Sequence, residues 1–266
     1  MALWTVERKD GIEIATYNNP PMNYFCAEAV GEFQTLIESW RDPAVRVVIL
    51  TGALPGRFIT HYSVEELHAL ASDRAAMIEA GPAVSAGYHA LLMSLRQLPK
   101  PIIAAINGDT MGGGFELAMS CDIRIMAQGD HRIGLPEVRL GILPGGTGTQ
   151  VLSRMIGLAK AIEFILRGRI VKPDEAAAIG LVHEVAADPV ARAIAMARDL
   201  IAQSPVALAA AKRAVYDGAD LELSDGLKIE SEQFLIPMTS DEGLKVMADY
   251  LAQPLEKRRD WLETPE

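Results

Sequence analysis

The sequence contains few cysteines and few aromatic residues. The two cysteines among its 266 residues, Cys26 and Cys121, form no CxxC pair and match no zinc-site spacing. We therefore predict buried thiols in a reducing compartment, the cytoplasm. Because aromatic residues make up only 6% of the chain, aliphatic side chains must fill most of the core. The length suits one large α/β domain with a helical extension.

An excess of positive charge and a long apolar run are also absent. The formal net charge is −10, so neither a nucleic acid nor an anionic membrane is an expected partner. No charge-free apolar run approaches the roughly 18 residues that a membrane-spanning helix needs. The first eleven residues have the pattern of a strand and not that of a basic, then apolar, signal segment.

Metal and nucleotide motifs are incomplete. The glycine-rich segment 145–149 lacks the lysine that follows the last glycine of a phosphate-binding loop. His61 and His68 are not spaced as an HExxH pair. We expect neither a metal site nor a nucleoside triphosphate site.

Hydrophobic periodicity predicts strands and helices in the first two thirds of the chain and helices alone in the last third. The predicted strands are Leu3–Val6, Ile12–Tyr17, Val45–Thr51, Pro101–Ile106, Ile123–Met126 and Val182–Val185. The predicted helices are Ala27–Trp40, most of Val64–Leu98, Phe115–Ser120, Gly146–Ile156, Leu158–Arg167 and Pro173–Ile179, with further helices from Pro189 onward. This order indicates an α/β core followed by a helical region.

A triple glycine, Gly112 to Gly114, lies between a predicted strand and a predicted helix. The first N–H groups of a helix have no partner within the helix, and the helix dipole favours negative charge there. Glycine also lets another molecule approach the backbone closely. The N–H of Gly113 is therefore a candidate donor to an oxygen that gains charge during a reaction. A tight turn that packs a helix on a strand accounts for the same glycines equally well.

Two glutamates follow in apolar surroundings, Glu116 directly after the glycines and Glu137 after a proline. Two carboxyl groups that share a water can add it to a double bond conjugated with a carbonyl, if one is ionised and the other protonated. Taken singly, Glu116 also fits a helix start and Glu137 a surface position.

Two motifs resemble the enoyl-CoA hydratase/isomerase (crotonase) superfamily. The first is KPIIAAING…GGGFELA…CD at residues 100–122, and the second is LPE…LGILPGGTGTQ at residues 135–150. The resemblance continues to residue 182, and the early loop NPPMN at residues 19–23 is similar as well. It covers most of the chain and strengthens the functional interpretation of both glutamates.

The resemblance implies a fold and an assembly. We expect a crotonase-like spiral of ββα units with the active site in residues 1–188, and a C-terminal helical oligomerisation region in residues 189–266. Homotrimers or homohexamers would follow. The implied substrate is an acyl-CoA thioester, with no metal and no cofactor beyond the CoA moiety.

The resemblance also implies roles for particular residues. The backbone amides of Gly113 and Tyr62 would form the oxyanion hole. Glu116 would activate water, and Glu137 would exchange a proton at the α-carbon. Four residues are expected to contact the CoA moiety: Met22, Phe58, Thr60 and Lys257. Lys257 begins the densest basic cluster, which is equally typical of a solvated helix end.

One loop departs from the family pattern. Where the family usually has Ala-Gly-Ala-Asp, this chain has Thr60-His61-Tyr62-Ser63. A backbone donor does not depend on its side chain, so Tyr62 can still serve. The larger side chains leave three activities open: hydration of a 2-enoyl-CoA, which the two acids favour, isomerisation of a 3-enoyl-CoA by Glu137, and acyl-CoA binding without turnover.

Overall fold

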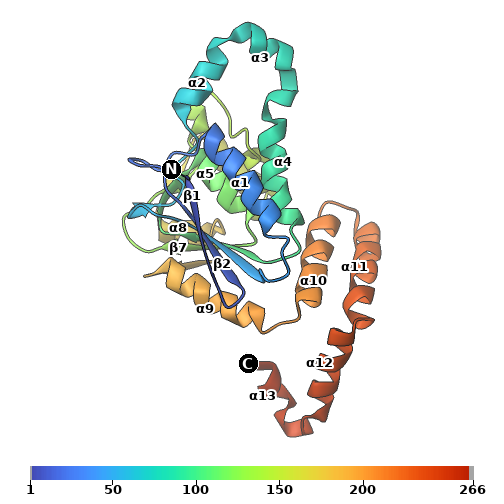
Figure 1. Ribbon diagram of the computed structural model, residues 1–266. Helices are drawn as coiled ribbons and strands as arrows, with labels where there is room; N and C mark the ends of the chain where they lie inside the picture. Colours follow the sequence, from blue (N-terminus) through green and yellow to red (C-terminus); the bar gives the residue numbers. More distant parts are fainter. Residues whose placement is uncertain (1, 264–266) are drawn as a thin grey trace.

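The computed structural model describes residues 2–263 and contains two β-sheets (Figure 1). The larger sheet has the strand order β1-β2-β3-β5-β7-β10, in which β1 and β2 are antiparallel and every later pair is parallel. Its strands are β1 (Trp4–Lys9), β2 (Ile12–Tyr17), β3 (Val47–Gly52), β5 (Ile102–Ile106), β7 (Ile123–Ala127) and β10 (Glu184–Ala186). All six were predicted: β2 has the predicted bounds, and the boundaries of the other five differ by at most three residues.

Both faces of this sheet are covered, which explains why its central strands are almost wholly apolar. In β3, Val48 and Leu50 face a large core shared with helices α1 (Ala27–Ser39), α4 (Ala86–Gln97) and α5 (Gly112–Ser120). The alternate residues, Val47 and Ile49, face helix α9 (Pro189–Ile201) on the other side. Figure 1 shows α9 beneath the sheet and the other three helices above it.

The smaller sheet has the order β4-β6-β8-β9 and was not predicted. Three of its strands have only two residues, too few to show a period of two. The strands are β4 (Gly56–Arg57), β6 (Gly108–Met111), β8 (Ile133–Gly134) and β9 (Ile170–Val171). Glycine is required at Gly108, because a Cβ there would overlap the backbone of Gly56.

The chain alternates between the two sheets, and this alternation makes the spiral. Strands β3, β5 and β7 of the large sheet are followed by β4, β6 and β8 of the small one, and each pair leads into a helical segment. These segments are α2 (Val64–Ser72), α3 (Arg74–Ala80), η1 (Gly81–Ser85) and α4; then α5; then η2 (Glu137–Leu140), α6 (Gly148–Ile156) and α7 (Leu158–Leu166). The predicted fold class, a spiral of ββα units followed by helices, is confirmed.

The last helices form an arm that projects from the core (Figure 1). The arm consists of α10 (Pro205–Gly218), α11 (Leu223–Met238), α12 (Asp241–Ala252), η3 (Leu255–Lys257) and α13 (Arg258–Glu263). Its base is fixed by Lys212, whose ammonium group is 2.9 Å from the carboxylate of Asp122.

Helix α8 (Pro173–Ile179) precedes β10. The boundary between the core, residues 1–188, and the helical region, residues 189–266, stays a prediction. Helix α9 begins just after this boundary and packs on the large sheet. No helix within residues 2–263 is both long and apolar enough to cross a membrane.

Candidate active site

Helix α5 begins directly after β6, and this junction exposes the amide of Gly113. Gly112 has a φ of +49°, a conformation that favours glycine, and it turns the chain from strand into helix. Gly114 lies against the carbonyl oxygen of Ile59, where a Cβ would overlap it. The helix thus starts at Gly112, three residues before the predicted start, because the glycines themselves form its first turn. The N–H of Gly113 has no partner within the helix.

The loop that carries Tyr62 lies beside this first turn. A bridge holds the loop, in which Phe25 N–H donates to His61 O (2.8 Å) and Ser63 N–H donates to Phe25 O (2.7 Å). The bridge does not use the N–H of Tyr62. A Cβ built on Gly113 would be 3.5 Å from the Tyr62 nitrogen, so the two predicted donors are neighbours. The arrangement can place two N–H groups on one oxygen.

Glu116 is held by three successive backbone amides. The N–H groups of Gly146, Thr147 and Gly148 donate to its Oε1 at 2.8, 3.0 and 2.7 Å. Thr147 has a φ of 151°, which side chains rarely adopt, and this turn aims all three amides at one atom. Burial raises the pKa of Glu116, while the three amides oppose the shift by stabilising the carboxylate. The segment that looked like a phosphate loop therefore binds the protein's own carboxylate.

Glu137 lies nearby without any such support. It is 8% exposed, and both of its carboxyl oxygens are buried without a hydrogen-bond partner among residues 2–263. A Cβ added to Gly112 would be 2.9 Å from Glu137 Oε1, so the carboxyl group reaches the start of α5. Burial, and then the charge of Glu116, raise the pKa of Glu137 to about 8. The structure brings the two predicted acids into electrostatic contact.

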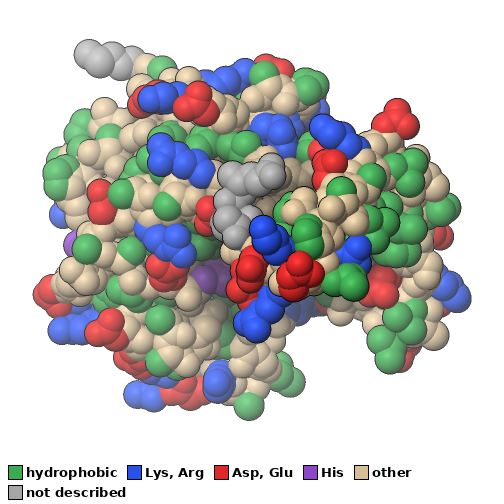
Figure 2. Space-filling view, turned by 90° about the horizontal axis from the view of Figure 1, so that it is seen from below, with side chains coloured by type: hydrophobic (Ala, Val, Ile, Leu, Met, Phe, Trp, Pro, Cys, Tyr) green, Lys and Arg blue, Asp and Glu red, His purple; other side chains and the backbone are tan. Residues whose placement is uncertain are grey.

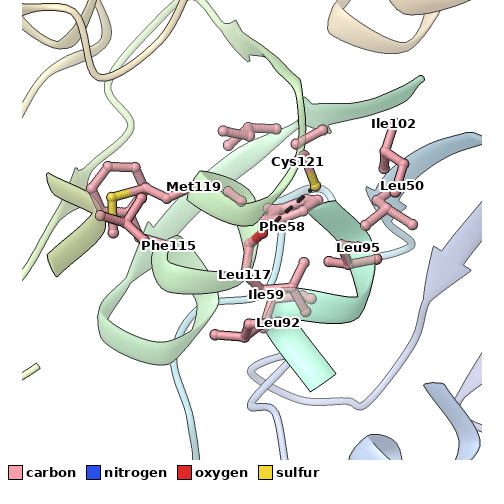
Figure 3. Close-up of a cluster of buried hydrophobic side chains, with 14 of the residues drawn as sticks. Leu50, Phe58, Ile59, Leu92, Leu95, Ile102, Phe115, Leu117, Met119 and Cys121 are labelled. Carbon is pink, nitrogen blue, oxygen red and sulfur yellow. Dashed lines mark hydrogen bonds between the residues drawn. The ribbon is translucent and has the colours of Figure 1, made fainter. Parts of the chain in front are cut away.

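The residues expected to contact CoA are divided between the core and the arm. The Thr60 hydroxyl donates to Met22 O at 2.6 Å, so these two loops are joined beside the oxyanion segment. The Phe58 side chain is fully buried; Figure 3 shows it among core side chains such as Leu95 and Leu117. Its backbone N–H donates to Asp109 O and its carbonyl accepts from the side-chain amide of Asn23, so its contact with CoA stays a prediction. Lys257 is exposed in η3, which joins α12 to α13. Figure 1 shows these two helices at the end of the arm, away from α5.

His61 and Tyr62, which are larger than the residues of the usual family pattern, pack against other aromatic rings. The ring of His61 stacks on Tyr24 with centroids 4.1 Å apart. The Tyr62 ring lies edge-on to Phe25 and to Tyr88, at 6.2 and 5.8 Å. Burial raises the pKa of Tyr62 well above its usual range, so its hydroxyl stays protonated. Tyr88, from α4, was not predicted as a site residue because no motif or spacing links it to the glutamates.

Comparisons with known proteins identify the family. The family model described as "Enoyl-CoA hydratase/isomerase" matches residues 7–263. The chain is 36% identical over 258 residues to the putative enoyl-CoA hydratase/isomerase YngF of Bacillus subtilis, covering 93% of this chain and 95% of that protein. It is 37% identical over 210 residues to the mitochondrial methylglutaconyl-CoA hydratase of Rattus norvegicus, covering 77% of this chain but 64% of that protein.

A solved structure is similar over nearly the whole chain. The crystal structure of an enoyl-CoA hydratase from Bacillus anthracis has a TM-score of 0.85 and 30% sequence identity, and the match covers 93% of this chain and 96% of that one. Sequence and fold comparisons thus lead to the same family.

Proposed function

Since this chain belongs to the enoyl-CoA hydratase/isomerase family, we propose that it adds water across the double bond of a 2-enoyl-CoA thioester. The observation that supports hydration most strongly is that two neighbouring buried acids differ in their hydrogen bonding. Amides stabilise the carboxylate of Glu116, whereas burial, and then the charge of Glu116, raise the pKa of Glu137 to about 8 and so favour its protonated form at neutral pH. Hydration requires one group of each kind.

The reaction follows from these two states. The thioester oxygen accepts hydrogen bonds from the amides of Gly113 and Tyr62, which draws electron density away from the β-carbon. Glu116 takes a proton from water as the water oxygen bonds to that carbon. The charge that develops on the thioester oxygen is stabilised by the two amides. Glu137 gives its proton to the α-carbon, and the thioester carbonyl is restored.

The first experiment follows loss of the conjugated enoyl absorbance when the pure protein is mixed with crotonyl-CoA. We expect hydration by the natural sequence and a loss of about a thousandfold or more in kcat for Glu116→Gln and for Glu137→Gln, because amides cannot exchange these protons. Turnover that is indifferent to both changes would contradict the proposal. Thioester binding without turnover by the natural sequence would instead indicate a binding protein.

Isomerisation of a 3-enoyl-CoA is the second candidate, with Glu137 alone moving the proton. The carboxyl oxygens of Glu137 favour it, because neither is held by a hydrogen bond within residues 2–263, so no such bond competes with proton transfer to a substrate carbon. Glu116→Gln discriminates between the two activities: it removes hydration in either case but spares isomerisation if Glu137 acts alone. Conversion of 3-hexenoyl-CoA to the conjugated 2-enoyl-CoA, followed by absorbance, measures this second activity.

We infer further that the arm assembles copies of this chain into a trimer or hexamer. Helices α10 to α12 expose many large apolar side chains, which together indicate a surface covered by a partner. They include Val215, Leu223, Leu227, Phe234, Leu235, Ile236, Leu244 and Leu251. Figure 2 shows apolar side chains gathered over the arm, at the right of the view. Light scattering during gel filtration should give three or six times the mass of the chain; a monomer would contradict the inference.

A further inference from the structure

Each of the two predicted oxyanion donors has its own carbonyl oxygen held by an aromatic side chain. The hydroxyl of Tyr88 donates to Gly113 O at 2.8 Å. Nδ1 of His61 is 2.7 Å from Tyr62 O. Because a carbonyl oxygen only accepts, His61 Nδ1 must carry the hydrogen of that bond. Both donor residues are therefore fixed through the atom that takes no part in the oxyanion hole.

The ring of Tyr88 is fixed by packing on three sides. It lies edge-on to Tyr62, and its centroid is 6.2 Å from that of Phe25. A Cβ on Gly146 would be 2.8 Å from Tyr88 Cδ1, so the ring also rests against the amide turn that holds Glu116. One side chain thus touches the oxyanion segment and the turn that binds the acid. Burial, and then the charge of Glu116, keep the pKa of Tyr88 well above its usual value, so its hydroxyl remains a donor.

His61 is fixed in a comparable way. Its ring stacks on Tyr24 at an interplanar angle of 27°, and its own carbonyl accepts the N–H of Phe25 at 2.8 Å. The imidazole cannot turn without losing the stacking contact and the hydrogen bond to Tyr62 O. The residues that distinguish this loop from the usual small-residue pattern therefore form a support for its backbone.

An oxyanion hole is effective only if its donors already point at the site where charge develops. We propose that Tyr88 and His61 are positioning residues that hold the amides of Gly113 and Tyr62 at the spacing a thioester oxygen requires. The proposal rests on the proposed function in one respect, namely that a CoA thioester carbonyl occupies this site. Neither side chain takes or gives a proton in the reaction.

The test removes each hydrogen bond and keeps each ring, with Tyr88→Phe and His61→Phe. Loss of an entire oxyanion donor lowers kcat by about a hundredfold or more. A donor that is only misplaced should lower kcat about tenfold, with KM within about twofold, because the ground-state carbonyl demands less of the hole. Matched controls are Tyr250→Phe in α12 and His68→Phe on the exposed face of α2; both should retain kcat within about twofold.

A second readout needs no turnover. The carbonyl carbon of bound [1-13C]butyryl-CoA should resonate downfield of the free thioester, because the two amides polarise the carbonyl. Each variant should move this resonance part of the way back, and the double variant further, while the controls leave it unchanged. Variants that match the controls in both kcat and chemical shift would overturn the proposal.

The proposed function and the positioning roles can be tested separately, because they are contradicted by results on different proteins. If the chain is not a hydratase, the natural sequence will not hydrate an enoyl-CoA, but it will still polarise butyryl-CoA if a thioester carbonyl occupies the site. The positioning roles fall with the site only if the natural sequence does not polarise butyryl-CoA either. If only the positioning roles are wrong, the natural sequence shows both properties and Tyr88→Phe and His61→Phe keep them. Thermal melts of all variants establish that each one is folded when it is compared.

Discussion

The two carboxyl groups of the candidate site lie in opposite surroundings. Glu116 meets a turn whose three amides converge on one oxygen. Glu137 meets the start of α5, and no group within residues 2–263 donates a hydrogen bond to its oxygens. Both groups are buried, so burial alone cannot give them different roles. The backbone of one short turn, residues 146–148, makes the difference.

This contrast indicates that main-chain geometry determines which of the two carboxyl groups acts as the acid and which as the base. A carboxylate that accepts several backbone N–H bonds is stabilised even in a dry site, whereas one without donors prefers to keep its proton. The turn requires glycine on both sides of Thr147. A Cβ at Gly146 would overlap Glu116 Oε2, and one at Gly148 would lie 2.8 Å from Oε1.

Among changes that leave both carboxyl groups in place, the largest effect is expected from breaking this turn with Gly148→Ala. The new methyl group would also be 2.7 Å from Pro144 Cβ, so Glu116 or the turn must move. A displacement of about 1 Å in a catalytic group lowers the rate about a hundredfold, which is the loss of kcat/KM expected in the crotonyl-CoA assay. Gly145→Ala is the matched control, because its Cβ has only one neighbour, at 3.7 Å. Equal losses in the two variants would contradict the role of the turn.

A smaller effect is expected from pH. If Glu137 must be protonated to act as the acid, activity is lost as pH rises through its pKa of about 8. Initial rates at low substrate should give a kcat/KM that falls about tenfold per pH unit above that value. The residual activity of Glu137→Gln should lack this alkaline limb. A limb that persists unchanged in this variant would assign the titration to another group.

The smallest effect concerns stability. Because the folded pKa of Glu137 lies above its unfolded value, the folded state retains a proton that the unfolded state releases. The contribution of Glu137 to the free energy of unfolding is therefore greatest at low pH and falls as pH rises, by about 1.4 kcal/mol per unit between the two pKa values. Glu137→Gln has no such group, so its advantage in urea unfolding should grow from pH 6 to pH 8. An advantage that is constant with pH would show that Glu137 is not shifted in the folded protein.

Sequence patterns predicted the large sheet well, and they pointed to the two glutamates of the candidate site. Long apolar runs such as Val47–Gly52 carry a clear periodic signal, and the glycine cluster before Glu116 indicates a catalytic pair once Glu137 is considered with it. The short strands of the second sheet, such as Gly56–Arg57, have no period to detect. They are formed by neighbours that are distant in sequence.

The residues that support the site could not be predicted from the sequence for the same reason. Tyr88 reaches Gly113 only because α4 packs beside α5, and no spacing rule connects the two residues. The segment after Pro144 was recognised as glycine-rich, but its partner, a carboxylate some thirty residues earlier in the chain, appears only in three dimensions. Phe58 resembled a ligand contact in its motif, and only packing shows that its ring belongs to the core.

The central claim is that at neutral pH Glu137 is protonated while Glu116 is ionised. Infrared difference spectroscopy tests it directly, because a protonated carboxyl group absorbs apart from carboxylates. At pH 7, a buried carboxylic acid band should be present in the natural sequence and in Glu116→Gln, absent in Glu137→Gln, and should titrate near pH 8 in the natural sequence. A band that disappears in Glu116→Gln and persists in Glu137→Gln would reverse the assignment of acid and base and contradict this account.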